Sequence, residues 1–285
     1  MFKFLQNTFI IFILISSSLF IGHFIDLNIN TKNVSHNSDI VFIGHSNLQY
    51  ALNDSLISKK LNSKCRNYGL GGQSLFWTII SAKKHKSQGI NNFIISLDEV
   101  SYTSGSKTYN SSSGMLNMRQ YKSFLNLNDW SAIMKMDLVF GIKSLFILPK
   151  FTSNFLGRYS RGERPFIDDL TKNNRGKIID IDDKILHDFI KNNPNSNFVI
   201  VKTPFHPNYY NKIMYKKTSE YVSNRLNSFK IYENTLVLDY GKFLKQDLFF
   251  MDHSHLNYRG SNILSNEITT RLIQTEFFSK NYDQK

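Results

Sequence analysis

Two groups of residues in this 285-residue sequence have side chains and spacings suited to acyl-transfer chemistry. Ser46 closes the apolar stretch VFIGHS, and Asp252 and His255 lie three residues apart in DHSH. A serine acts as a nucleophile when a histidine takes its proton and a carboxylate orients that histidine. Residues three apart can share one turn, so Asp252 and His255 are candidates for these two roles. Ser46 alone also fits a helix N-cap, where serine is among the commonest residues.

Five short strand-like segments, separated by helix-like segments, predict the strands that would position these residues. They cover residues 39–44, 64–69, 91–97, 197–203 and 234–241. The first, DIVFIG, is a continuous apolar run, which is typical of a parallel strand buried on both faces. The helix-like segments cover residues 48–60, 73–88, 177–193 and 257–277, and a further polar helix ends near Phe229. This alternation predicts an α/β fold, an α/β/α sandwich around a parallel sheet.

The alternation is interrupted at about residues 100–176. This stretch is first rich in Ser and Gly, then carries clustered apolar residues. It contains no complete core pattern of its own. We therefore interpret it as an inserted helical or loop subdomain within a domain that covers residues 30–285.

Residues 1–29 have the character of a membrane anchor or signal segment. Residues 4–25 are mostly apolar and contain no Asp, Glu, Lys or Arg; as a helix they would span about 33 Å, enough to cross a bilayer. A cleaved signal peptide, ending at Ser16–Ser18, and a buried helix are the alternatives. Because the apolar run continues past these serines, we expect an uncleaved anchor. Lys3 would then stay in the cytoplasm, with the domain extracytoplasmic, on the periplasmic or cell-surface side.

The formal net charge of +13 does not by itself indicate a nucleic-acid partner. Most of the basic residues are lysines, and the sequence has neither an RNA-binding signature nor an arginine-rich helix. We therefore expect no nucleic-acid partner, although the charge favours anionic surfaces such as lipid headgroups or acidic glycans. The single cysteine excludes an intramolecular disulfide.

Three motifs in order resemble those of the SGNH, or GDSL-type, hydrolases. GHS stands where that family has Gly-Asp-Ser, NYGLGG where it has Asn-x-Gly-x-x-Gly, and DHSH matches its Asp-x-x-His before the last helix. The resemblance covers residues 39–99 and 197–277. It implies a flavodoxin-like α/β/α sandwich of the SGNH type, with no cofactor.

The resemblance also implies a role for each matching residue. Ser46 would be the nucleophile, His255 the general base and Asp252 the residue that orients it. The backbone N–H groups of Ser46 and Gly72 would form the oxyanion hole, and Asn67 and Gly69 match the turn that presents Gly72. Since no other clear ligand set accompanies DHSH, we expect no metal.

Two residues depart from the family pattern. His45 replaces the usual Asp beside the nucleophile, and Asp98 stands where a Gly-x-Asn-Asp block would supply an Asn. An ionised carboxylate cannot donate to an oxyanion, and loss of one such donor typically costs about 100- to 1000-fold in rate. His206 is a candidate replacement donor. We treat His45, Asn67, Asp98 and His206 as candidate substrate-binding residues, and we expect His253 at the surface.

The resemblance and the anchor together imply a bacterial envelope enzyme. Its expected activity is that of a serine O-acyl esterase or acyltransferase acting on an acylated cell-surface glycan or a small ester. Hydrolysis and transfer share the first half-reaction, so the sequence does not separate them. The alternatives are a catalytically inactive SGNH-fold protein that binds glycan or scaffolds an envelope polysaccharide assembly, with biosynthesis proteins as partners, and a basic cytoplasmic protein.

Overall fold

The computed structural model describes residues 38–71, 73–102, 183–210 and 213–278, all of which belong to one compact unit. The expected anchor at residues 1–29 and nearly all of the expected insertion lie outside these ranges. Within them, no helix has both the length and the apolar character needed to cross a membrane.

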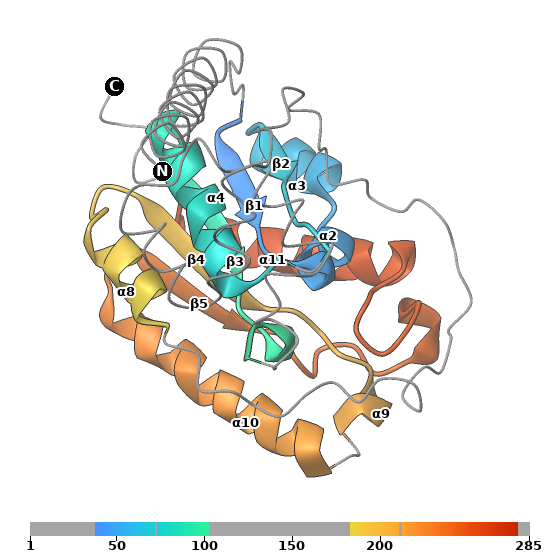
Figure 1. The fold of residues 1–285 in the computed structure, drawn as a ribbon. Coiled ribbons are helices and arrows are strands. Elements are labelled where there is room, and N and C mark those ends of the chain that lie inside the picture. The colour runs from blue at the N-terminus through green and yellow to red at the C-terminus, as the bar shows by residue number, and fades with distance from the viewer. Residues whose placement is uncertain (1–37, 72, 103–182, 211–212, 279–285) are drawn as a thin grey trace, which may run out of the picture. The chain divides into compact units, whose positions relative to one another are not determined.

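Five parallel strands form the centre of the unit (Figure 1). The strands are β1 (Ile40–Ile43), β2 (Cys65–Asn67), β3 (Asn92–Ser96), β4 (Asn197–Lys202) and β5 (Thr235–Asp239). Their order in the sheet is β2-β1-β3-β4-β5, and every neighbouring pair is parallel. This is the flavodoxin-like order. The five predicted strands and the parallel α/β fold are confirmed.

Helices cover both faces of the sheet. One face packs against α4 (Leu75–Ser87), α8 (Lys184–Lys191) and α10 (Ile213–Ser228). The other packs against α2 (Ser46–Ala51), α3 (Asp54–Leu61) and α11 (Tyr258–Gln274). The short elements are η1 (Glu99–Tyr102), α9 (Pro207–Tyr210), η4 (Phe229–Ile231) and η5 (Asp247–Phe249).

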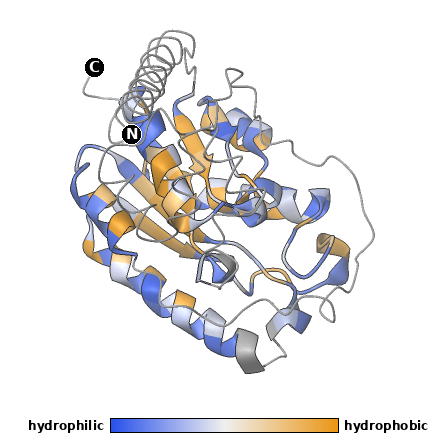
Figure 2. Ribbon diagram, viewed as in Figure 1, coloured by the Kyte–Doolittle hydropathy of each residue, from blue (hydrophilic) through white to orange (hydrophobic). Residues whose placement is uncertain are grey.

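Strand side chains alternate between two separate hydrophobic cores. Val41 and Phe93 point toward the α4 face, whereas Phe42 and Ile94 point toward the α11 face. Strands β1, β3 and β4 are therefore apolar at most positions, which explains their hydrophobic runs, whereas the edge strand β2 is largely polar. Figure 2 shows this apolar character concentrated in the central strands.

The predicted helix over residues 48–60 was wrong as a single element. The chain leaves α2 at Leu52, and Asn53 then starts α3, its side-chain oxygen accepting a hydrogen bond from the Leu56 backbone N–H at 3.2 Å. Asparagine competes well for such N-cap positions. The resulting bend separates the short helix that carries Ser46 from the longer helix that packs on α11.

The loop after β2 packs directly against α2. A Cβ atom at Gly69 would lie 2.7 Å from the backbone nitrogen of Gln49, closer than side chains normally approach backbone. The Asn67 amide donates to the carbonyl oxygens of Leu48 (3.2 Å) and Leu52 (2.9 Å), and its oxygen accepts from the Gly69 N–H (2.9 Å). This clamp fixes the short α2 helix from its C-terminal end.

We expect Gly69→Ala to lower the free energy of unfolding by about 1–3 kcal/mol, because the added methyl group forces the loop off α2. Gly71→Ala is the matched control in the same loop, since a Cβ there meets nothing within 4 Å. Denaturant unfolding of both variants measures the difference. Equal stability of the two variants would contradict the close approach.

Candidate active site

Ser46 lies where the chain passes from β1 into α2. His45, not Ser46, is the N-cap of α2: its ring Nδ1 accepts a hydrogen bond from the Asn47 backbone N–H at 3.3 Å. The interpretation of Ser46 as an N-cap was therefore wrong. Ser46 is the first helical residue, half-buried, and its hydroxyl is available for other contacts.

Ser46, His255 and Asp252 form a hydrogen-bonded chain. The Ser46 Oγ lies 2.9 Å from His255 Nε2, and His255 Nδ1 lies 2.7 Å from Asp252 Oδ2. The three side chains that the sequence nominated as nucleophile, base and orienting carboxylate are thus brought together in the order that proton transfer requires.

The loop between η5 and α11 shapes the histidine–carboxylate pair. Phe250 and Leu256 form an antiparallel bridge at its base. Inside the loop, Asp252 Oδ1 accepts hydrogen bonds from the backbone N–H groups of Ser254 (2.8 Å) and His255 (2.9 Å), an Asx-type turn. One carboxylate oxygen therefore holds the turn while the other holds the imidazole.

The electrostatics of this pair favour an ionised Asp252. Burial alone would raise the pKa of Asp252, but the hydrogen bond and charge interaction with His255, together with the donors of Ser254, hold it well below its usual range. An ionised Asp252 accepts a hydrogen bond from the N–H at His255 Nδ1. The unprotonated Nε2 is then free to accept a hydrogen bond from the Ser46 hydroxyl. Tyr50 packs edge-on against the His255 ring, with 5.0 Å between centroids.

Asp98 is not placed as an oxyanion group. Its side chain is fully buried; Oδ1 lies 2.6 Å from His45 Nε2, and Oδ2 accepts from the Thr203 hydroxyl at 3.2 Å. The two departures from the family pattern, His45 and Asp98, are thus partners of each other. Both side chains are engaged in this buried contact, which gives no support to the expectation that they contact substrate.

The two remaining candidates, Asn67 and His206, make structural contacts, and His253 is not where the sequence predicted it. Asn67 is buried in the clamp on α2. His206, the candidate replacement donor, is buried, with Nε2 on Asp247 (2.8 Å) and Nδ1 on the Asn208 N–H (3.2 Å). His253, expected at the surface, is also buried. Gly72 lies outside the described residues.

Two buried amides flank the motif residues and escaped the sequence analysis. Asn47 follows Ser46 and Gln73 follows Gly72; neither side chain makes a hydrogen bond in the described structure. A buried amide without partners is costly, about 1–3 kcal/mol for each group, and such groups concentrate at functional sites. Thr203, Ser254 and Tyr50 were also missed, since nothing in their sequence context marks them.

A second pair of buried charges adjoins Asp98. Lys202, at the end of β4, lies 3.1 Å from Glu99 Oε1, and its ammonium group also donates to the Ser219 hydroxyl at 2.7 Å. Burial raises the pKa of Glu99, and the positive charge of Lys202 opposes that shift. Across the described ranges, no group of three or more His, Cys, Asp or Glu residues is arranged to hold a metal.

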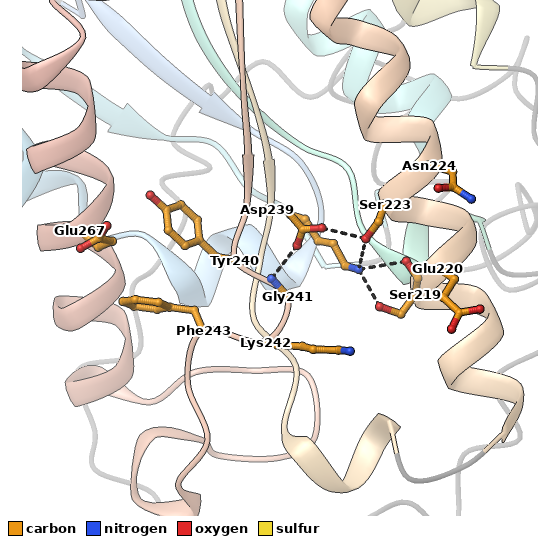
Figure 3. A pocket seen from close by; sticks show the side chains of 11 residues that line it. Ser219, Glu220, Ser223, Asn224, Asp239, Tyr240, Gly241, Lys242, Phe243 and Glu267 are labelled. Carbon is orange, nitrogen blue, oxygen red and sulfur yellow. Dashed lines mark hydrogen bonds between the residues drawn. The ribbon is translucent and has the colours of Figure 1, made fainter.

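A cavity of about 810 Å³ opens beside this ion pair (Figure 3). In the figure Ser223 of α10 meets Asp239 of β5, a hydrogen bond of 2.7 Å, with Tyr240 and Phe243 on the other side of β5. Ser46, Asp252 and His255 are not among the lining residues. The cavity is therefore separate from the serine–histidine–aspartate chain.

Comparisons with known proteins give only distant similarities. No family model and no curated protein matches this sequence. Among solved structures, a protein from Streptococcus pneumonia whose name refers to platelet activating factor is 10% identical (TM-score 0.42; 94% of this chain, 98% of that one). A family two carbohydrate esterase from Clostridium thermocellum is 12% identical (TM-score 0.41; 83% and 63%). An acetyl xylan esterase from Butyrivibrio proteoclasticus is 12% identical (TM-score 0.37; 86% and 66%).

The lowered pKa of Asp252 predicts how its contacts contribute to stability as pH changes. Because the folded-state pKa lies below the unfolded value of about 3.9, the contribution is present above pH ~4 and is lost as pH falls through the folded value. We expect Asp252→Asn to lower the melting temperature most at pH 5–7. The difference in melting temperature between Asp252→Asn and wild type should narrow between pH ~4 and ~2, and thermal melts at each pH measure it. A gap that widens over that range would contradict the assignment.

Proposed function

We propose that this protein is a serine O-acyl esterase or acyltransferase that works through an acyl-enzyme on Ser46. The observation that carries the proposal is the hydrogen-bonded chain from Ser46 Oγ through His255 to Asp252. Its members come from the β1–α2 turn and from the loop before α11, and the three groups lie in hydrogen-bond contact, as general-base activation requires.

In the first half-reaction, Ser46 Oγ attacks the ester carbonyl carbon while its proton passes to His255 Nε2. The carbonyl π electrons move to oxygen, and Asp252 stabilises the imidazolium that forms. The backbone N–H of Ser46 belongs to the first turn of α2, where N–H groups have no intrahelical partner, so it is a donor for this oxyanion. When the tetrahedral intermediate collapses, His255 returns the proton to the leaving alkoxide, and the acyl group stays on Ser46.

In the second half-reaction an acceptor hydroxyl attacks the acyl-serine. His255 takes its proton, the ester bond to Ser46 breaks, and Ser46 Oγ regains a proton from His255. Water as acceptor gives hydrolysis, and a sugar hydroxyl gives transfer. Both reactions use the same three side chains and differ only in the acceptor.

The position of Asp98 bears on the alternative of a catalytically inactive protein. That alternative rests on the missing Asn, whose amide would have donated to the oxyanion. Since both Asp98 oxygens accept hydrogen bonds, from His45 and Thr203, the carboxylate has a structural reason to be present besides a loss of activity. The hydrogen-bonded chain of Ser46, His255 and Asp252, which a binding or scaffold protein would not need, favours the enzyme.

We further propose that the substrate is an acylated cell-surface glycan and that residues 1–29 anchor the domain outside the cytoplasm. The support for the location is the uncharged apolar run at residues 4–25, preceded by Lys3. An extracytoplasmic ester hydrolase or transferase would meet envelope glycans as its most abundant acylated polymers.

A fluorophosphonate probe tests the nucleophile directly, because an activated serine displaces its fluoride and becomes covalently phosphonylated. We expect labelling of the Ser46 peptide in the wild-type protein, and none in Ser46→Ala. Hydrolysis of 4-nitrophenyl acetate should fall by more than about 10³-fold in Ser46→Ala and in His255→Asn.

His187→Asn is the matched control for the histidine substitution. His187 lies in α8 on the other face of the sheet, stacked on Phe229, so its loss should leave hydrolysis within about twofold of wild type. If well-folded wild-type protein is not labelled, or if Ser46→Ala is labelled at the same rate, the proposed function is wrong.

A fusion tests the proposed location. Alkaline phosphatase needs disulfides and is active only outside the cytoplasm, so we expect phosphatase joined after Lys285 of the full chain to be active and membrane-bound. A fusion of residues 30–285 alone serves as the control and should be inactive. An inactive full-chain fusion would contradict the anchor and its orientation.

A further inference from the structure

The structure contains a second histidine–aspartate couple at Ser46, separate from His255 and Asp252. His45, the residue before Ser46, uses both ring nitrogens: Nδ1 accepts from the Asn47 N–H and Nε2 lies 2.6 Å from Asp98. The His45 side chain is 2% exposed and that of Asp98 is fully buried. The hydrogen bonds therefore run from the end of β3 to both sides of Ser46.

We infer that Asp98 and His45 are positioning residues that fix Ser46 in its reactive place, an inference that rests on the proposed function. Asp98 holds the ring of His45 in one orientation, and the ring holds the Asn47 N–H. Ser46 lies between His45 and Asn47 in the chain, so fixing both neighbours limits the movement of its backbone. Neither side chain needs to touch the substrate.

The inference explains why a short helix can carry the nucleophile. α2 has six residues, too few to be stable through its own hydrogen bonds. Its C-terminal carbonyls are held by Asn67, and its N-terminus is held by His45. Asp98 is held in turn by Thr203 of the β4 end, so the orientation of His45 is set by the sheet and not by the helix.

A parallel couple elsewhere in the chain supplies a control. His206 precedes α9 as His45 precedes α2, with Nδ1 on the Asn208 N–H and Nε2 on Asp247. α9 carries none of Ser46, Asp252 and His255, and Asp247 is 71% exposed. His206 packs against His253 of the loop that carries Asp252 and His255, with 5.4 Å between ring centroids, so Asp247→Ala is a control for backbone exchange at Asn47 and not for activity. The control for activity is His187→Asn, on the other face of the sheet.

The test compares kcat and KM for 4-nitrophenyl acetate in Asp98→Ala, Asp98→Asn, His45→Asn and the control His187→Asn. Misplacing a reacting group by about 1 Å can cost about 100-fold in rate. We expect kcat to fall about 10- to 100-fold in Asp98→Ala and His45→Asn, with KM within about twofold of wild type. Because Asn is itself a good N-cap residue, a lower kcat in His45→Asn would report the missing contact with Asp98 and not a missing cap.

Asp98→Asn is the rescue variant, because its amide oxygen accepts the same hydrogen bond from His45; its kcat should lie within about threefold of wild type. His187→Asn should match wild type. Wild-type kcat in Asp98→Ala and His45→Asn, a loss confined to KM, or an equal loss in Asp98→Ala and Asp98→Asn would each overturn the inference. If Asp98→Ala does not fold, His45→Asn decides the outcome.

Backbone amide exchange at Asn47 separates this inference from the proposed function. The Asn47 N–H donates to His45, so its exchange should accelerate in Asp98→Ala relative to Asp98→Asn and Asp247→Ala. If wild-type protein is not labelled in the fluorophosphonate assay, the proposed function is contradicted but the positioning role is not. If Asn47 exchange is unchanged in Asp98→Ala, the positioning role is contradicted but the proposed function is not.

Discussion

Two adjacent carboxylates, Asp98 and Glu99, are completely buried at the end of β3, and the polar organisation of the sheet edge follows from the need to satisfy them. Burying a carboxylate without partners is prohibitive, so each requires donors from neighbouring segments. Thr203 and Lys202, consecutive at the end of β4, supply one donor each, and His45 supplies another from the β1 end. The acids therefore align the ends of the three central strands.

This arrangement connects Ser46 to the far side of the sheet. Lys202 also donates to Ser219 of α10, and Ser223 of the same helix donates to Asp239 of β5. A line of polar contacts thus runs along the carboxyl edge, from the exposed Asp239 of β5 to the buried turn that carries Ser46. Ser46 is accordingly located by the sheet, whereas Asp252 and His255 are located by their own loop.

The sequence predicted the parts that depend on local pattern. Apolar runs marked the strands other than β2, alternation with helix-like segments marked β2, and the spacing of Asp252 and His255 indicated a shared turn. The pairing of His45 with Asp98 was not predicted, because the two residues are 53 positions apart and each was judged by itself as a departure from a family pattern. Considered together, His45 after β1 and Asp98 after the neighbouring strand β3 are complementary, because an imidazole N–H can donate to a carboxylate. The bend at Asn53 was missed because apolar spacing continues across it.

The loop that carries Asp252 and His255 has a consequence for when the protein becomes reactive. Phe250 pairs with Leu256, so the base and its carboxylate can meet as soon as the last seventh of the chain is made. The Ser46 hydroxyl, by contrast, is 209 residues away from His255, so their contact closes a loop that spans most of the chain and costs chain entropy to form. Under the proposed function, Ser46 is activated only once this long-range contact has formed. A partly folded chain would then be protected from premature acylation.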